Sequence, residues 1–309
     1  MPFLTINVHQ ADQMSTPVRY LWPHLHKALA ALPCETHEEL LRTGVCIEVD
    51  LIDSPKFICG VVVETQKVQI STGCLQTLWA CGYLNMMYWD KLYKAGGLAR
   101  SVVMDPSGDF ELQNAYKLFE WSLNVFDGNI PGLKWPANLP MPLPDAGGNS
   151  WEALADELTL EAVGYLLLHE IAHVYLKHDV SESSAWSIEQ EKEADSQALE
   201  WIFRGAQNPT NGHQIKRSIS IATALLMQCA FALFTKKWGG ESHPPKWQRL
   251  DQAMRQIATD PNHPVFAFLG QLARMYRTMA KSPSDSYQYN NFLAAFDHFI
   301  ETLSKEDQA

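Results

Sequence analysis

Residues 166–176 read Leu-Leu-Leu-His-Glu-Ile-Ala-His-Val-Tyr-Leu, an apolar run interrupted by two histidines and one glutamate. Such a run is typical of a helix that is buried on most of its faces. Residues four apart lie on one face of a helix, so His169 and His173 can bind one ion through neutral imidazoles. Glu170 stands beside the first histidine, as in other helical H-E-x-x-H sites. The stretch therefore predicts a metal-binding helix.

Zinc is the metal that this pattern predicts. Zinc brings the pKa of a bound water down to about 7, and a nearby carboxylate such as Glu170 can take its proton. Two imidazoles and a carboxylate would be costly to bury in an apolar helix without a metal or other partners. H-E-x-x-H alone is moderately specific, because three fixed residues in five recur by chance. A core helix with two hydrogen-bonded histidines is the alternative.

A third ligand is expected further along the chain, since a catalytic zinc usually takes three protein ligands. A second helix is predicted to start near residue 188, and Glu191 and Asp195 lie one turn apart on one of its faces. We predict Glu191 as the third ligand and Asp195 as the acceptor for the spare N–H of a ligand histidine. Taken alone, an acidic run at a helix start is more often a solvated first turn that the helix dipole favours.

Four other residues compete for the place of the third ligand. A ligand six residues after the second histidine would be Asp179, but the turn that it needs falls on Leu176, which does not readily adopt left-handed backbone. His178 lies one position short, and on a continuing helix it would point about 140° away from the second ligand. The last two competitors lie two positions to either side of the predicted ligand and face elsewhere: Glu189 and Glu193.

A third block, which runs from His243-Pro244 to Arg249, would by itself be a turn and a helix start. The three blocks appear in the order His169-Glu170-x-x-His173, Glu191-x-x-x-Asp195 and His243-Pro244-x-x-x-x-Arg249. This order resembles the gluzincin peptidases of the HtpX and CAAX-processing type. The resemblance implies that His243 stabilises the tetrahedral oxyanion and that Arg249 pairs with a carboxylate of the site, Glu191 or Asp195.

The chain lacks the several membrane helices of those enzymes and is more similar to the soluble phage-exclusion peptidases of the Lit type. Those proteins have about this length, a mixed amino-terminal region and a helical half with an H-E-x-x-H motif and a Glu-x-Glu-Ala-Asp block. The motif-level resemblance covers residues 160–255. It implies zinc-dependent cleavage of a specific cytosolic protein in antiviral defence, with a phage component as activator. The known Lit target, elongation factor Tu, makes a translation factor a candidate substrate, although no residue here specifies it.

Two other functions stay open at this point. Regulators of the ImmA/IrrE type share the first two blocks, but they usually adjoin a helix-turn-helix partner, and the His243 block favours the peptidases. A non-catalytic protein with a structural zinc is the second alternative. Closed structural sites prefer four ligands, many of them thiolates, whereas this site has no cysteine nearby and keeps Glu170.

The predicted fold class is α+β. We expect a mixed strand and helix region at 1–127, a Pro/Gly-rich linker or cleft loop at 128–150, and a mainly helical zincin-like region at 151–309. Five prolines in the middle segment exclude a helix or a central strand there. The predicted strands are 45–52, 57–63 and 67–71, the last two as a hairpin, followed by a helix at 75–94. The later predicted helices are 151–178, 188–204, 213–237, 245–258, 261–281 and 286–304.

Charge and composition limit the kinds of partner and the cellular location that we expect. The net charge is −11 without a clustered Lys/Arg stripe, which excludes nucleic acid as an expected partner. The six cysteines form no C-x-x-C pair and are expected to be buried thiols, and the amino terminus lacks the pattern of a signal peptide. We therefore expect a cytoplasmic protein. The apolar stretch 219–234 is shorter than the roughly 20 residues of a membrane span, so a buried helix is favoured over a membrane-anchored peptidase.

Overall fold

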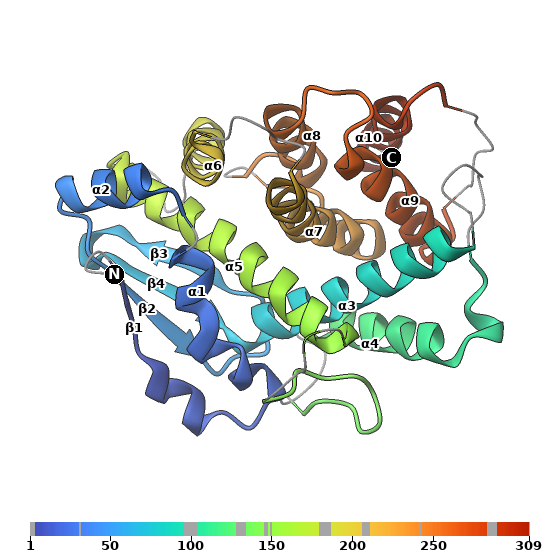
Figure 1. Cartoon of the computed structure of the whole chain (residues 1–309), viewed down its shortest axis with the longest axis horizontal. Helices are drawn as coiled ribbons and strands as arrows, with labels where there is room; N and C mark the ends of the chain where they lie inside the picture. The colour runs from blue at the N-terminus through green and yellow to red at the C-terminus, as the bar shows by residue number, and fades with distance from the viewer. Residues whose placement is uncertain are drawn as a thin grey trace.

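The computed structural model describes residues 4–30, 32–95, 104–127, 134–144, 148, 150–178, 187–205, 211–240, 243–282 and 289–308. Asp179, one of the competing ligands, and parts of the predicted segment 128–150 lie outside these ranges. The described residues contain a small sheet and a larger set of helices, which confirms the α+β class (Figure 1).

The sheet has four strands in the order β1-β2-β4-β3. The strands are β1 (Leu4–Ile6), β2 (Ile47–Ile52), β3 (Cys59–Val62) and β4 (Lys67–Ser71). In β2 every second residue is buried, as expected for a strand with one face on the core. β2 pairs with β1 and β4 in parallel, whereas β3 and β4 form the predicted antiparallel hairpin around the 3₁₀ turn Val63–Thr65. Among the described residues β3 pairs with β4 alone, so it forms one edge of the sheet.

Besides the sheet and its hairpin turn, the described part of the first 127 residues contains eight helical elements. Three short 3₁₀ helices (Val8–Gln13, Pro17–Tyr20 and Trp22–His24) lead into α1 (Leu25–Ala30), which α2 (Cys34–Arg42) follows. The long helix α3 (Thr72–Lys94) lies where one was expected, and a 3₁₀ turn at Pro106–Gly108 precedes α4 (Phe110–Phe126). Asp109 caps α4 by accepting a hydrogen bond from the backbone N–H of Leu112.

The helical region contains α5 (Trp151–Tyr175), α6 (Ile188–Phe203), α7 (Gly212–Thr235), α8 (Lys246–Ile257), α9 (Pro264–Met279) and α10 (Phe292–Gln308). Each of them lies where the sequence predicted a helix, with ends shifted by a few residues. α5 contacts α1, α3, α6, α7 and β3, and in Figure 1 it crosses the molecule diagonally between the sheet and the later helices. Its residues from Ala162 to Val174 are all buried. The H-E-x-x-H motif therefore lies on a fully buried segment of α5.

The helix α7 covers the apolar stretch that was considered as a membrane span. It is the one helix among the described residues that is long and apolar enough to cross a membrane, but 78% of its most apolar 18-residue window is buried inside the protein. It thus packs as a core helix. The expected burial of the cysteines is right for Cys74, Cys81 and Cys229 and wrong for Cys34 and Cys46, which are exposed on α2 and before β2.

Candidate metal centre

His169 and His173 lie one helical turn apart on α5, and their rings meet edge to face. His169 and His173 are both buried, and their Nε2 atoms are 3.3 Å apart. Ser150 caps the start of α5 by accepting from the N–H of Ala153, and the apolar residues between the two histidines fix the helix against its neighbours. Both Nε2 atoms point to the same place because the spacing of four puts them on one face.

The third member of the group comes from α6. Ser187 and Gln190 form a capping box that starts this helix, and Glu191 follows in the first turn with its side chain buried. Its Oε2 atom lies 3.4 Å from His169 Nε2, and its Oε1 atom lies 3.6 Å from His173 Nε2. These three side chains each place one ligand atom within 4.8 Å of the others. The group can therefore hold a metal ion.

His169 is supported from the deep side by charged groups. Its Nδ1 atom lies 2.8 Å from Asp195 Oδ1, and Arg249 binds both oxygens of the same carboxylate at 2.8 and 2.7 Å. The hydroxyl of Tyr165 donates to Asp195 at 2.7 Å. Burial opposes ionisation of Asp195, but the attraction of Arg249 and His169 outweighs it and holds the pKa of this carboxyl well below its usual range. Asp195 is thus an ionised, fully engaged acceptor for His169.

The two histidines have opposite electrostatic surroundings. Burial lowers the pKa of the His169 imidazole, but Asp195 and Glu191 together raise it by more, so the net shift is upward. Burial and the neighbouring His169 lower the pKa of the His173 imidazole to about 3. His173 is therefore neutral at physiological pH, whereas His169 has to release a proton when its Nε2 binds a metal ion.

His173 is supported by a residue that the sequence did not single out for this role. Helix α5 ends at Tyr175 rather than continuing to 178, and the chain turns back so that His178 Nδ1 lies 2.9 Å from His173 Nδ1. On its other side His178 Nε2 lies 3.0 Å from Glu193 Oε2. The expectation that His178 points away from the site is wrong, because it rested on a continuing helix. Glu189 is exposed and pairs with Lys192, away from the metal group.

Glu170 lies between the histidines and the edge strand of the sheet. Its carboxylate accepts a hydrogen bond from the backbone N–H of Val61 in β3. Burial raises the pKa of Glu170 to about 7, and this effect exceeds the opposing attraction of His169. A carboxylate with such a pKa is a stronger base than an exposed one and is suited to proton transfer near neutral pH.

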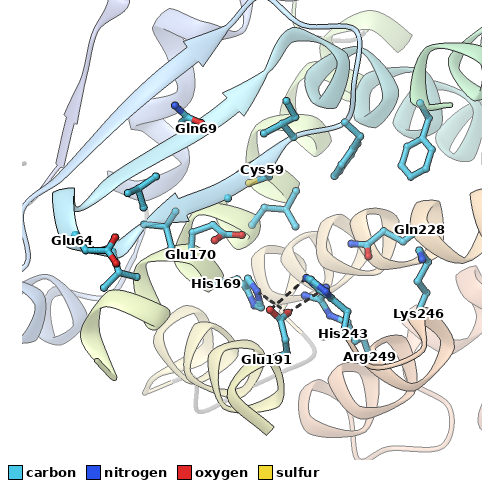
Figure 2. A pocket seen from close by; sticks show the side chains of 18 residues that line it. Cys59, Glu64, Gln69, His169, Glu170, Glu191, Gln228, His243, Lys246 and Arg249 are labelled. Carbon is cyan, nitrogen blue, oxygen red and sulfur yellow. Dashed lines mark ion pairs between the residues drawn. The ribbon is translucent and has the colours of Figure 1, made fainter. Parts of the chain in front are cut away.

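These residues open onto one cavity of about 730 Å³. The strand β3 forms one wall, and helices α5 to α8 form the other, as Figure 2 shows. His169, Glu170, Glu191, His243 and Arg249 all line this cavity. A cavity of this volume can hold a small molecule or a peptide segment of several residues.

His243 stands at the mouth of the site. Its side chain is 53% exposed, and its Nε2 atom lies 3.5 Å from Glu191 Oε1. The backbone N–H of Lys246 donates to the carbonyl of Trp238, which closes the loop that carries His243 in front of α8. Burial of the part of the ring that faces the protein lowers the pKa of His243. The neutral ring can donate one N–H to a group that enters the cavity.

The structure brings together all seven residues that the sequence proposed for the site: His169, Glu170, His173, Glu191, Asp195, His243 and Arg249. Sequence reasoning missed Tyr165, His178 and the backbone of Val61. Tyr165 could have been found, because it stands four residues before His169 and shares its helix face. Nothing local to Val61 signals its contact with Glu170.

The family of this chain follows from a comparison with known proteins. The family model described as Peptidase U49 matches residues 68–269, about two-thirds of the chain. The match runs from β4 into α9 and includes every side chain of the metal group together with Glu170 and His243. The molecule is thus a peptidase, and the chain belongs to the Peptidase U49 family.

One relative supports the same conclusion over a longer range. A protein of Escherichia coli (strain K12) described as "Cell death peptidase" is 24% identical over 254 residues, which cover 77% of this chain and 80% of that protein. No solved structure matches the chain at a significant level. The resemblance to peptidases of the Lit type is confirmed by the family and by this relative.

Proposed function

We propose that this peptidase is a zinc-dependent endopeptidase. The observation that carries the proposal is the convergence of three buried ligand atoms, from His169, His173 and Glu191, beside the buried base Glu170 at the floor of an open cavity. Such a donor set, two imidazoles and one carboxylate on helices, is that of catalytic zinc sites, which leave the fourth position to water or substrate.

The spacing of the three ligand atoms supports a small tetrahedral cation. With zinc bonds of about 2.0–2.1 Å, the ligand atoms of a tetrahedral site lie about 3.3–3.4 Å apart. The separations here are 3.3 Å between the two Nε2 atoms, 3.4 Å from His169 to Glu191 and 3.6 Å from His173 to Glu191. Glu191 Oε2 is buried and has no hydrogen-bond partner among the described residues. A cation would satisfy this oxygen.

The chain's own residues would divide the hydrolysis between them. When bound, zinc supplies Lewis acidity, which makes water a better nucleophile and polarises a peptide carbonyl. Glu170 would take the proton of the attacking water on its carboxylate and pass it to the leaving amine nitrogen. The N–H of Val61 holds this carboxylate beside the cavity. His243 would donate from its ring to the oxyanion, an interaction that can be worth about 3 kcal/mol.

The substrate is proposed to be an extended protein segment. The cavity runs along β3, an edge strand, and such an edge offers backbone groups for pairing with a further strand. The apolar lining from Phe57, Phe126 and Leu166 suits side chains on either side of a scissile bond. Arg249 is engaged with Asp195, so we assign it to positioning the site rather than to binding substrate.

The cellular role is proposed from the relatives. The Escherichia coli protein is described by its name as a cell death peptidase, and Lit-type peptidases are tied to phage exclusion. We propose that this chain cleaves one or few cytoplasmic proteins, a translation factor being the candidate class, after activation by a phage component. Comparing protein termini in cells that express the wild type or Glu170→Gln would identify the substrate. Robust degradation of unfolded casein by the purified protein would argue against such selectivity.

Replacing Glu170 by glutamine tests the catalytic proposal. The amide cannot accept a proton, so Glu170→Gln should bind zinc in a 1:1 ratio, keep the fold and lose peptide cleavage by a factor of about 1,000 or more. Glu152→Gln, on the first turn of the same helix, is the matched control and should cleave like the wild type. Zinc content is measured by atomic absorption and cleavage by mass spectrometry. Full activity of Glu170→Gln at saturating zinc would refute the mechanism, and a wild type that binds zinc without cleaving any protein would favour a structural zinc site.

A further inference from the structure

The end of helix α5 folds back on the metal group in a defined way. The backbone N–H of His178 donates to the carbonyl of His173 at 3.0 Å, and the N–H of Lys177 donates to the carbonyl of Val174 at 3.2 Å. Lys177 has a left-handed backbone, with φ of 56°. This is the hydrogen-bond pattern of a Schellman motif, in which the residue after the left-handed position returns to the residue five places before it. The motif places His178 directly on His173.

The side chains at these two positions form a contact that Schellman motifs usually make with apolar groups. Here they are two imidazoles, both buried, with their Nδ1 atoms 2.9 Å apart. The second nitrogen of His178 lies 3.0 Å from the carboxylate of Glu193, whose side chain is 64% exposed. A line of three side chains therefore runs from the protein surface to a predicted metal ligand.

The chemistry of the three groups fixes which atom donates at each step. A carboxylate oxygen accepts, so the ring N–H of His178 that faces Glu193 is Nε2–H. A neutral imidazole carries one N–H, which leaves His178 Nδ1 as an acceptor. His173 must then donate from Nδ1–H, and its Nε2 atom carries the free lone pair. This is the atom that faces His169 and Glu191.

We propose that His178 and Glu193 are positioning residues that hold His173 in the tautomer and ring orientation that bind the metal ion. The proposal rests on the zinc site of the proposed function and adds a support for the second histidine, as Asp195 supports the first. His178 reaches neither the ion nor the substrate. Partners of this kind typically change metal affinity by 10- to 100-fold.

Zinc affinity of purified full-length variants, measured by competition with a chromophoric chelator, tests the proposal. His178→Phe keeps the ring volume but removes the acceptor, and its zinc dissociation constant should rise about 10-fold or more. His178→Asn places an amide oxygen near the position of Nδ1 and should restore the affinity to within about threefold of the wild type, with the amide oriented as acceptor. Glu193→Ala should raise the dissociation constant about three- to tenfold, whereas Glu189→Ala, on the same turn of α6, should leave it unchanged.

Nitrogen-15 spectra of histidine-labelled wild type provide a readout that does not depend on the stability of any variant. With zinc bound, His173 should show Nδ1–H and a ligated Nε2, and His178 should show Nε2–H. The reverse tautomer of His178 would overturn the proposal. So would a His178→Phe protein that is folded by circular dichroism and binds zinc within twofold of the wild type. A wild type that binds no zinc would instead refute the proposed function, so the two failures are distinguishable.

Discussion

The two histidines of the motif lie one turn apart on one helix, yet the protein supports them in different ways. His169 is held from the interior by Asp195, which Arg249 and Tyr165 engage in turn. His173 is held from the helix end by His178, which leads to the exposed Glu193. We call Asp195, Arg249 and Tyr165 the interior support of His169. We call His178 and Glu193 the surface support of His173. The interior support is charged and buried, whereas the surface support ends at a carboxylate that is open to solvent.

This difference has an energetic consequence. A buried ion pair is not by itself a strong source of stability, but removing one partner leaves an uncompensated buried charge. The interior support should therefore be needed both for folding and for metal binding. The surface support can be changed without leaving a buried charge, since Glu193 keeps access to water. We therefore expect changes to the interior support to lower both folding stability and metal affinity. Changes to the surface support should lower mainly the metal affinity.

The largest effect on metal content is expected from the ligand that belongs to neither support. Glu191→Ala should lose zinc and cleavage together, because two imidazoles remain where three ligands are needed. Asp179→Ala, Glu189→Ala and Glu193→Ala should each keep a zinc-to-protein ratio near one at saturating zinc, Glu193→Ala with the weaker affinity given above. The ratio is measured after dialysis against zinc-buffered solution. Retained zinc in Glu191→Ala, with loss in Asp179→Ala, would overturn the ligand assignment.

The second largest effect is expected on the interior side. Arg249→Met removes the guanidinium and leaves Asp195 buried without its main partner, which should lower the free energy of unfolding by about 3–5 kcal/mol. Urea denaturation followed by circular dichroism measures this loss. Arg255→Met is the control. Arg255 lies on the same helix as Arg249, its side chain is 48% exposed, and it pairs with Asp251 of α8 and Asp297 of α10. Its replacement should cost less than about 1 kcal/mol. Equal losses of unfolding free energy in the two variants would show that Arg249 contributes no more to stability than Arg255 does.

The helical region was predictable because several local signals agree there. Apolar periodicity and glycine or proline breakers predict α5 to α10 to within a few residues, with the largest shift at α10, which begins at Phe292 rather than 286. The Ser187 to Gln190 capping box is also visible as a sequence pattern. The pairing of His169 with His173 followed from spacing alone, since positions four apart on a helix share a face whatever surrounds them. Glu191 and Asp195 needed one further assumption, that α6 packs back on α5, and the two helices are in contact.

The amino-terminal region was predicted less completely. The hairpin and α3 were found, but β1, α1, α2 and α4 were not, and neither was the parallel pairing of β2 with β4. A three-residue strand is too short to show a period. Parallel pairing joins strands that a connection separates, so no local pattern reports it. The wall of the cavity was therefore invisible from the sequence, because the position of β3 at the sheet edge depends on that pairing.

A smaller effect than those of Glu191 and Arg249 is expected at the mouth of the cavity, where neither support reaches. His243→Ala should lower the turnover number about 100-fold, as loss of an oxyanion donor does, with the zinc content unchanged. His213→Ala, a change at the start of α7, is the control and should have no effect. Turnover is measured on the substrate that the terminal comparison identifies. Loss of zinc would identify His243 as a metal ligand. An unchanged turnover number would show that the loop of His243 only leads into helix α8.

The smallest effect is expected at Lys177, where no local sequence signal marks a helix end. Glycine is the usual residue at the left-handed position of a Schellman motif, and a lysine there has to adopt a backbone that costs about 1 kcal/mol. The Lys177 side chain is exposed, so its removal sacrifices little contact. Lys177→Gly should raise the free energy of unfolding by about 0.5–1 kcal/mol and the melting temperature by about 1–2 °C.

The same position separates the geometry of the turn from the chemistry of His178. Lys177→Gly keeps the left-handed turn, so His178 stays on His173 and the zinc affinity should remain within about twofold of the wild type. A β-branched residue is a poorer fit to that backbone than lysine, so Lys177→Val should both lower the melting temperature and weaken zinc binding by displacing His178. Calorimetry and the chelator competition measure the two effects on the same samples. If Lys177→Val melts earlier but binds zinc like the wild type, the turn does not hold His178 in place, and the surface support depends on the pairing with Glu193 alone.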